Sequence, residues 1–228
     1  MKWLKQLQQS IAQTPACKSC FESINYTSFH KIFSFDEKVI CDNCIFESKP
    51  VFKSFKINGI KGLAIYDYSP FIRTKFFLYK ICEDYELKDY FLKPYSLELK
   101  LLFNGYKIVP IPSYIENDKA RGYNHVIEIF KCLNLEIVPC LIKTKDIKQK
   151  LLNYDERQKI SEIIEIRPND LFNKKVLLVD DVITTGASMK AAINLIQKCQ
   201  PKILKILVIS KRELTEEEKN NLKNKVIL

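Results

Sequence analysis

One short stretch, residues 176–188 with the sequence VLLVDDVITTGAS, constrains the fold of this 228-residue chain more than any other. Four apolar residues run directly into Asp180 and Asp181, and hydroxyl and small residues follow as far as Ser188. A short apolar run bounded by turn residues is typical of a strand that is buried on both faces of a parallel sheet. An amphipathic helix is expected after Ser188, and Pro201 is expected to end it.

The residues at the end of this expected strand have the chemistry of a ribose-5-phosphate site. Open parallel sheets bind ligands at the carboxyl ends of their strands, where Asp180 and Asp181 can accept hydrogen bonds from ribose hydroxyls. Residues 184–188 can present hydroxyls and backbone N–H groups to a phosphate at a helix N-terminus. The chain lacks Gly-Lys-Ser/Thr and Gly-x-Gly-x-x-Gly, which argues against nucleoside triphosphate and dinucleotide sites. The alternative is a strand end with solvated carboxylates and an N-capped helix.

The other segments alternate between expected strands and helices, which predicts a right-handed parallel α/β sheet. Strands are expected at residues 63–68, 106–109, 135–139 and 203–209. Helices are expected over residues 1–14, from Ser69-Pro70, over about 126–132, from Asn153 to about Ile164, and from Thr215. The polar segment Glu116–His125 is expected to be an exposed, mobile loop. Residues 45–60 are expected to join two units, a small module over 1–50 and a larger domain over 51–228.

Four of the eight cysteines form two Cys-x-x-Cys pairs, Cys17 with Cys20 and Cys41 with Cys44. Two pairs at this separation match a four-thiolate zinc site. The segment between them, expected to form a hairpin, is too short for a core of its own, so the metal would supply much of the folding free energy. Four thiolates leave no open coordination position, so the zinc would be structural. The alternative is four unrelated buried thiols.

The net charge is +10, from 37 basic and 27 acidic residues. Such a charge suits a polyanionic partner, although a lysine-rich coding bias gives the same charge without one. Candidate nucleic-acid contacts are Arg73, Lys75, Lys80, Lys143, Lys145, Lys148 and Lys150, each of which could equally be a solvated surface charge. The five arginines are Arg73, Arg121, Arg157, Arg167 and Arg212. Where arginine persists in so lysine-rich a chain, bidentate anion binding is favoured.

The sequence predicts a cytoplasmic protein. No apolar run approaches the roughly 18 residues of a membrane span. The first nine residues, MKWLKQLQQ, are too polar for the core of a signal peptide. The cysteines are therefore expected to be thiols rather than disulfides.

Residues 176–188 resemble the phosphoribosyl-pyrophosphate (PRPP) motif of type I phosphoribosyltransferases. The chain as a whole is similar to the ComF family, which joins an N-terminal zinc ribbon to that fold. The similar parts, in chain order, are the two cysteine pairs, Tyr66 through Arg73 to Lys80, Val109–Pro112, Arg121–Asn124, Thr144, Gln149, Leu152, Arg157 and the Asp-Asp stretch. The resemblance implies an α/β fold: a type I phosphoribosyltransferase-like parallel sheet flanked by helices, with a small N-terminal four-cysteine zinc-ribbon module.

The resemblance also implies a role for each part of the site. Asp180 and Asp181 would hold the ribose hydroxyls. The 5-phosphate would be bound by Thr184, Thr185, Gly186, Ala187 and Ser188. The pyrophosphate would be faced by Pro112 and Ser113 and covered by Lys119 and Arg121, with Mg²⁺ bridging pyrophosphate and ribose oxygens. Ser188 stands where the family usually has threonine, which keeps the hydroxyl, and no hood that recognises a base is identifiable.

Members of the ComF family are associated with DNA uptake during natural transformation. The resemblance therefore implies a protein that binds PRPP and single-stranded DNA and works with other DNA-uptake proteins. Two alternatives remain open. One is an active phosphoribosyltransferase acting on a small nucleobase or amine, and the other is a regulator that senses PRPP.

Overall fold

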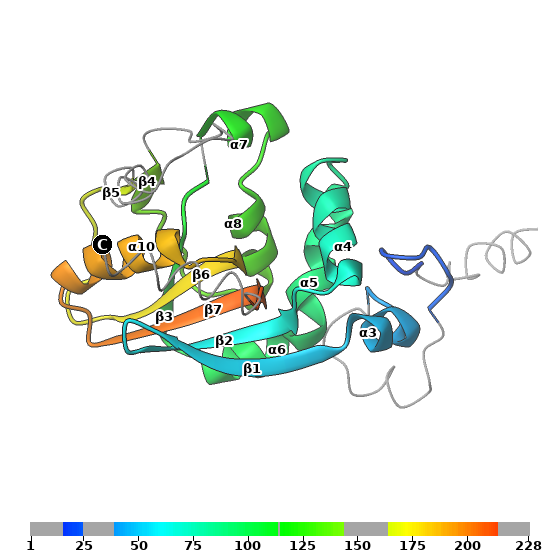
Figure 1. Ribbon diagram of the computed structural model, residues 1–228, viewed down its shortest axis with the longest axis horizontal. Coiled ribbons are helices and arrows are strands. Elements are labelled where there is room, and N and C mark those ends of the chain that lie inside the picture. The colour runs from blue at the N-terminus through cyan, green and yellow to red at the C-terminus, as the bar shows by residue number, and fades with distance from the viewer. Residues whose placement is uncertain (1–15, 25–38, 114, 144–163, 214–228) are drawn as a thin grey trace, which may run out of the picture.

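The computed structural model describes residues 16–24, 39–113, 115–143 and 164–213 (Figure 1). The helices expected over residues 1–14, from Asn153 and from Thr215 lie outside these residues, as does the hairpin expected between the cysteine pairs.

A five-stranded sheet with the order β1-β2-β7-β6-β3 forms the centre of the structure (Figure 1). Its strands are β1 (Pro50–Ile57), β2 (Ile60–Asp67), β3 (Tyr106–Pro110), β6 (Lys175–Ile183) and β7 (Ile203–Lys211). The last four are mutually parallel, which confirms the expected strands at 63–68, 106–109, 176–179 and 203–209. Their carboxyl ends therefore lie along one edge of the sheet.

The predicted parallel sheet carries one antiparallel strand, at its edge. Strand β1 pairs antiparallel with β2 through a two-residue turn, Asn58-Gly59, in which both residues have positive φ (47° and 78°). Positive φ at both residues of an Asn-Gly pair is typical of a two-residue β-hairpin turn. Residues 45–60 are therefore mostly regular structure rather than a joint.

The two faces of the sheet pack against different helices, as the alternation of side chains along a strand requires. Leu177, Val179 and Leu207 lie in one apolar cluster with four helices: α4 (Pro70–Lys80), α5 (Lys88–Leu92), α6 (Ser96–Leu102) and α8 (His125–Phe130). Val176 and Leu178, which alternate with them along β6, lie in a second cluster with helix α10 (Ala187–Lys198). Strand β6 is buried on both faces for this reason, which explains its continuous apolar run.

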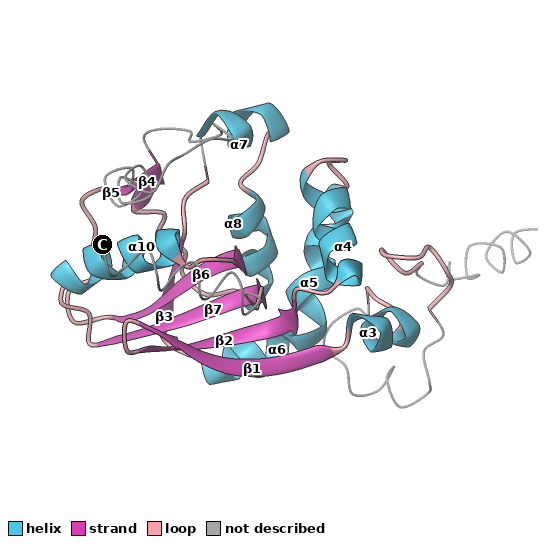
Figure 2. Ribbon diagram, viewed as in Figure 1, coloured by secondary structure: helices cyan, strands magenta, loops and turns pink. Residues whose placement is uncertain are grey.

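Helices cover both faces of the sheet (Figure 2). They are α3 (Asp42–Ser48), α4 (Pro70–Lys80), α5 (Lys88–Leu92), α6 (Ser96–Leu102), α7 (Ile115–Arg121), α8 (His125–Phe130) and α10 (Ala187–Lys198), with 3-10 turns at Tyr85–Leu87, Lys93–Tyr95 and Lys131–Leu133. Helix α4 begins as predicted, because the Ser69 hydroxyl accepts the Ile72 N–H at 3.3 Å and Pro70 occupies its first turn. A small second sheet pairs β4 (Leu141–Lys143) with β5 (Ile164–Ile166).

The strand expected at residues 135–139 does not form. Ile137 makes only an isolated parallel bridge with Ile108 at the edge of the main sheet. Pro139 has no N–H to extend the pairing, so the ladder stops there.

The cysteine-containing segment packs directly on the larger part of the chain. Cys17 and Cys44 belong to the same apolar cluster as helices α4 and α5. The Tyr90 hydroxyl donates to the Cys44 carbonyl at 3.1 Å, and the Lys18 ammonium pairs with Asp89 at 2.8 Å. The division of the chain at residue 50 stays a prediction, and these contacts join its two sides.

None of the helices in the described ranges has the length and hydropathy that a membrane span requires.

Candidate functional site

Strand β6 carries Asp180 and Asp181 to the carboxyl edge of the sheet. It lies between two parallel neighbours, β7 and β3, so the carboxylates are held on a rigid element. In parallel sheets this edge is where ligands bind. The two carboxylates have different surroundings, and the difference decides what each can do.

Asp181 is buried, with 6% of its surface exposed, and both of its carboxylate oxygens are engaged. Its Oδ2 pairs with the Lys80 ammonium of α4 and accepts a hydrogen bond from His125 Nε2 of α8 at 2.6 Å. Its Oδ1 accepts the N–H of Val182. Burial alone would raise the pKa of Asp181, but the Lys80 charge and the His125 interaction outweigh it and hold the pKa well below its usual range.

His125 connects Asp181 to helix α7. Its Nδ1 lies 3.0 Å from Arg121 Nη1. A guanidinium can only donate, so His125 Nδ1 accepts and the proton given to Asp181 is on Nε2. The chain Arg121–His125–Asp181–Lys80 therefore links α7, α8, β6 and α4 through one buried carboxylate.

Asp180 is the carboxylate that is left for a ligand. Its Oδ1 accepts the N–H of Asp181 at 2.9 Å, and no hydrogen bond from the described residues engages its Oδ2. Burial and the adjacent charge of Asp181 raise the pKa of Asp180 well above its usual range, against the opposing charges of Lys80 and Lys143. A ligand hydroxyl at this position would meet a carboxyl group with a free acceptor atom.

Residues 184–188, between β6 and the first turn of helix α10, are the candidate phosphate site, and we call them the anion cradle. Gly186 is the N-cap residue, with φ +75°, and this left-handed conformation rather than lack of space requires glycine. Gly186 has no side chain to cap the first-turn N–H groups. Thr184 and Thr185 are exposed beside them. The Thr185 hydroxyl accepts the Ala187 N–H at a long 3.5 Å, and the N–H groups and hydroxyls at the N-terminus of this twelve-residue helix suit a phosphate.

The segment expected to be a mobile loop contains a helix instead, which corrects that prediction. Helix α7 covers Ile115–Arg121 and is followed after a short turn by α8. Asp118 anchors it, because its Oδ1 accepts the Ser113 hydroxyl at 2.5 Å and its Oδ2 accepts the Asn124 amide at 2.7 Å. Arg121 faces His125, whereas Lys119 is exposed. Pro112 and Ser113 lie between β3 and α7, at the same edge of the sheet as Asp180.

The candidate nucleic-acid residues occupy several environments. Lys80 is paired with Asp181, and the Lys75 ammonium lies 5.2 Å from the centre of the Phe71 ring and 5.5 Å from that of Tyr90. Lys143, at the end of β4, is close enough for its charge to act on Asp180. Arg73 is exposed on α4. Lys145, Lys148 and Lys150 lie outside the described residues.

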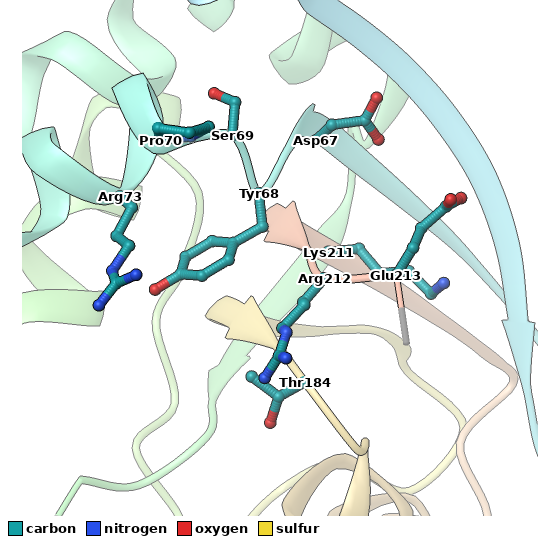
Figure 3. A pocket seen from close by; sticks show the side chains of 9 residues that line it. All are labelled: Asp67, Tyr68, Ser69, Pro70, Arg73, Thr184, Lys211, Arg212 and Glu213. Atoms are coloured by element: carbon teal, nitrogen blue, oxygen red, sulfur yellow. The ribbon is translucent and has the colours of Figure 1, made fainter. Parts of the chain in front are cut away.

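A cavity of about 720 Å³ opens where β2, β6 and β7 end (Figure 3). Tyr68, Arg73, Thr184, Lys211 and Arg212 are among the residues that line it, and we call it the arginine cavity. Thr184 connects it to the anion cradle.

The four cysteines of the two pairs converge as predicted. The Sγ atoms of Cys17, Cys20, Cys41 and Cys44 all lie within 4.8 Å of one another. The Sγ atoms of Cys20 and Cys41 are 3.7 Å apart. Tetrahedral zinc with Zn–S distances of about 2.3 Å needs sulfur atoms roughly 3.8 Å apart, so the cluster could hold this metal.

Backbone groups favour the thiolate form of one of these cysteines. Burial raises the pKa of Cys17, but the N–H groups of Cys41 and Ser19 point at its Sγ from 3.3 and 3.4 Å. The net effect lowers the pKa to about 7. Such N–H contacts to sulfur also orient a thiolate that binds a metal.

Comparison with known proteins agrees with this geometry. A family model described as the phosphoribosyl transferase domain matches residues 138–227. The chain is 26% identical over 189 residues to competence protein ComFC of Streptococcus pneumoniae, covering 83% of each protein. It is 26% identical over 131 residues to ComFC of Bacillus subtilis, covering 57% of this chain and 55% of that protein. The chain is a ComF-like protein with the phosphoribosyltransferase fold.

More distant similarities to this ComF-like protein lie among purine enzymes. Adenine phosphoribosyltransferase of Halothermothrix orenii is 28% identical over 151 residues, which cover 64% of this chain and 76% of the enzyme. Among solved structures, a hypoxanthine-guanine phosphoribosyltransferase of Bacillus anthracis is 13% identical, with a TM-score of 0.37 over 56% of this chain and 73% of that one. A purine phosphoribosyltransferase of Pyrococcus horikoshii is 20% identical, with the same TM-score over 57% of this chain and 76% of that one.

Sequence reasoning missed the partners of Asp181 in this ComF-like protein. The sequence suggests Lys80 as a nucleic-acid contact or a solvated charge and His125 as the end of a loop, and it pairs neither of them with Asp181. One signal was available for His125, because the chain has only two histidines and this one follows a glycine and a rare arginine. Lys80 gives no comparable signal among so many lysines.

Zinc binding is tested most cleanly at Cys20, which is exposed and therefore contributes little to packing. We expect about one zinc per chain in the purified, reduced protein, because metal-binding free energy contributes to folding. Cys20→Ser should lose most of the metal and unfold several degrees lower, whereas Cys82→Ser, at an exposed cysteine outside the cluster, should do neither. Elemental analysis and thermal unfolding measure both effects. Folded, reduced wild-type protein without zinc would contradict the assignment.

The two aspartates should affect stability in opposite directions. Asp181→Asn removes the buried carboxylate that pairs with the partly buried Lys80 ammonium and should lower the free energy of unfolding by roughly 3 kcal/mol at pH 7. Asp180→Asn should raise it. The raised pKa of Asp180 means that the folded state holds its proton to higher pH, so wild-type stability falls as pH rises from about 4 through that pKa. Urea unfolding between pH 4 and 8 measures both, and a shift of the same sign in the two variants would refute the distinction.

Proposed function

We propose that this ComF-like protein binds PRPP at the carboxyl edge of its sheet and takes part, in the cytoplasm, in handling single-stranded DNA during uptake. One observation carries the PRPP proposal: Asp180, whose Oδ2 accepts no hydrogen bond from the described residues, precedes the N-terminus of helix α10 by a few residues on the same edge of the sheet. PRPP carries both groups that such a site suits, ribose hydroxyls and a 5-phosphate.

The proposal assigns separate roles to the two aspartates. Asp180 accepts the ribose hydroxyls, and residues 184–188 bind the 5-phosphate. Asp181 positions Asp180, because Lys80 and His125 hold its carboxylate in place. Pro112, Ser113, Lys119 and Arg121 face the pyrophosphate. Mg²⁺ enters with PRPP and offsets the pyrophosphate charge, as oxygen-rich phosphate ligands suit this ion.

The DNA part of the proposal is supported by relatives and by charge. The two ComFC relatives are named competence proteins. The net charge of +10 favours binding to a phosphate backbone. Other DNA-uptake proteins are the expected partners in such a role.

A transferase and a PRPP sensor are the competing functions. The family model and the adenine phosphoribosyltransferase relatives favour the first. Release of pyrophosphate from PRPP with a defined nucleobase or amine acceptor, abolished by Asp180→Asn, would establish it. A change in DNA affinity on adding PRPP, without release of pyrophosphate, would establish the second.

Calorimetry with PRPP and Mg²⁺ tests the ligand. The wild type should bind PRPP, and Asp180→Asn should weaken binding by about tenfold or more, since an amide that keeps its oxygen on the Asp181 N–H presents an NH₂ group where the ribose hydroxyl needs an acceptor. Asp170→Asn is the matched control, because that carboxylate is exposed and interacts with Lys107 and Lys174 away from the site. Equal PRPP affinity in all three proteins would exclude Asp180 as the ribose-binding group.

Salt titration with a single-stranded oligonucleotide tests the DNA role. Affinity should fall steeply with salt, and replacing Lys145, Lys148 and Lys150 with glutamine should reduce the log–log slope by about 2 if all three contact phosphates. The same change at Lys61, Lys198 and Lys202, three exposed lysines elsewhere, is the charge-matched control. Transformation frequency should fall only in the first variant. Binding that does not depend on salt, or equal losses in both variants, would refute this DNA surface.

A further inference from the structure

The arginine cavity contains none of the residues assigned to ribose and pyrophosphate. It shares one residue with the 5-phosphate set, Thr184. Its walls come from the ends of β2 and β7 and the start of α4, segments that the PRPP proposal does not use. Its volume of about 720 Å³ lies in the range of small-molecule sites. The cavity therefore has room for a second ligand beside the anion cradle.

Two arginines supply the strongest anion-binding groups in this cavity. In Figure 3 the guanidinium ends of Arg73 and Arg212 lie on either side of the Tyr68 ring, with Arg212 toward Thr184. Within the described part of the chain, no carboxylate pairs with Arg73. The backbone N–H of Arg212 donates to the Ile183 carbonyl at 2.8 Å, which fixes this residue beside the cradle. Guanidinium groups match phosphate oxygens bidentately.

The cavity is also lined by Lys211 and by two carboxylates, Asp67 and Glu213. The Lys211 ammonium lies 5.9 Å from the centre of the Phe55 ring, and Glu213 forms an ion pair with Lys53. The lining therefore holds three basic side chains against two carboxylates, and the guanidinium groups of Arg73 and Arg212 are the ones that can bind phosphate bidentately.

Tyr68 gives the cavity an aromatic wall between the two arginines. The side chain is half-buried, so its orientation is supported by the core, while its ring is open to the cavity (Figure 3). Nucleobases stack on such rings without sequence preference. A sugar phosphate would use the arginines but leave this face without a partner, so a nucleotide fits the lining better.

We propose that the arginine cavity binds a nucleotide, with its phosphate between Arg73 and Arg212 and its base against Tyr68, while PRPP occupies residues 184–188. The description of the cavity as a second subsite rests on the proposed PRPP function, whereas nucleotide binding by the two arginines does not. The nucleotide is either a free mononucleotide or the 5′-phosphorylated end of a strand, since both offer the same phosphate and base.

The test is calorimetry on the full chain with thymidine 5′-monophosphate, with and without saturating PRPP and Mg²⁺. We expect the monophosphate to bind in both conditions, and thymidine to bind at least about tenfold more weakly. Arg73→Gln and Arg212→Gln should each weaken the monophosphate by about tenfold or more, and should change PRPP affinity much less. Arg167→Gln, at an exposed arginine that does not line the cavity, is the matched control and should change neither. Circular dichroism verifies that each variant is folded.

Two results of the monophosphate titrations would overturn the proposal. If PRPP excludes the monophosphate, the nucleotide occupies the anion cradle and the cavity is not a second subsite. If the monophosphate binds equally well to the two arginine variants and to Arg167→Gln, the guanidinium groups do not hold its phosphate.

Short oligonucleotides distinguish the source of the nucleotide. Tighter binding of 5′-phosphorylated hexathymidylate than of the monophosphate, dependent on both arginines, would identify a strand end. Equal binding of the two would identify a free mononucleotide, and equal binding of phosphorylated and unphosphorylated strands to every variant would overturn the proposal. If PRPP fails to bind while the monophosphate still requires both arginines, the PRPP function falls and the nucleotide site stands.

Discussion

The buried carboxylate of Asp181 is the interaction on which the arrangement of the site depends. Removing a carboxylate from water costs several kcal/mol unless charge and hydrogen bonds compensate it. Lys80 from α4, His125 from α8 and the Val182 N–H supply that compensation from three elements. The position of α4 and α8 relative to β6 is therefore set by charge as well as by apolar packing. Asp180 remains available because its neighbour takes up these partners.

The order of the strands brings the other candidate ligand-binding residues to the same carboxyl edge of the sheet as the aspartates. The parallel strands β2, β7, β6 and β3 end together, so the turns that follow them meet at one face. The turn after β6 holds the anion cradle, and the turns after β2 and β7 line the arginine cavity. Helix α4 connects the cavity to the aspartates, because Arg73 lines the cavity and Lys80 pairs with Asp181. A ligand bound by Arg73 would therefore stabilise the helix that holds Asp181 in place.

The sequence predicted those parts that local patterns encode. The apolar runs of β3, β6 and β7 require two buried faces, and the spacing of the cysteines requires convergence. It did not predict α7, because a seven-residue polar segment shows no apolar period. The anchor of α7 joins Asp118 to Ser113 and Asn124, five and six residues away, which is not a spacing that a helical pattern encodes. The pairing of Asp181 with Lys80 was equally invisible, because it joins residues far apart in the chain.

The arginines show how composition and structure inform each other. Lysine supplies most of the positive charge of this chain. At a solvated surface, replacing arginine by lysine costs little. At an anion site, the same replacement loses the planar guanidinium group that binds two oxygens at once. Three of the four arginines in the described ranges lie near the sheet edge: Arg121 against His125, and Arg73 and Arg212 in the cavity. Arg167 does not line the cavity. The arginines at this edge fit the two anions that we propose. Arg121 would be near the pyrophosphate, and Arg73 and Arg212 would bind a nucleotide phosphate.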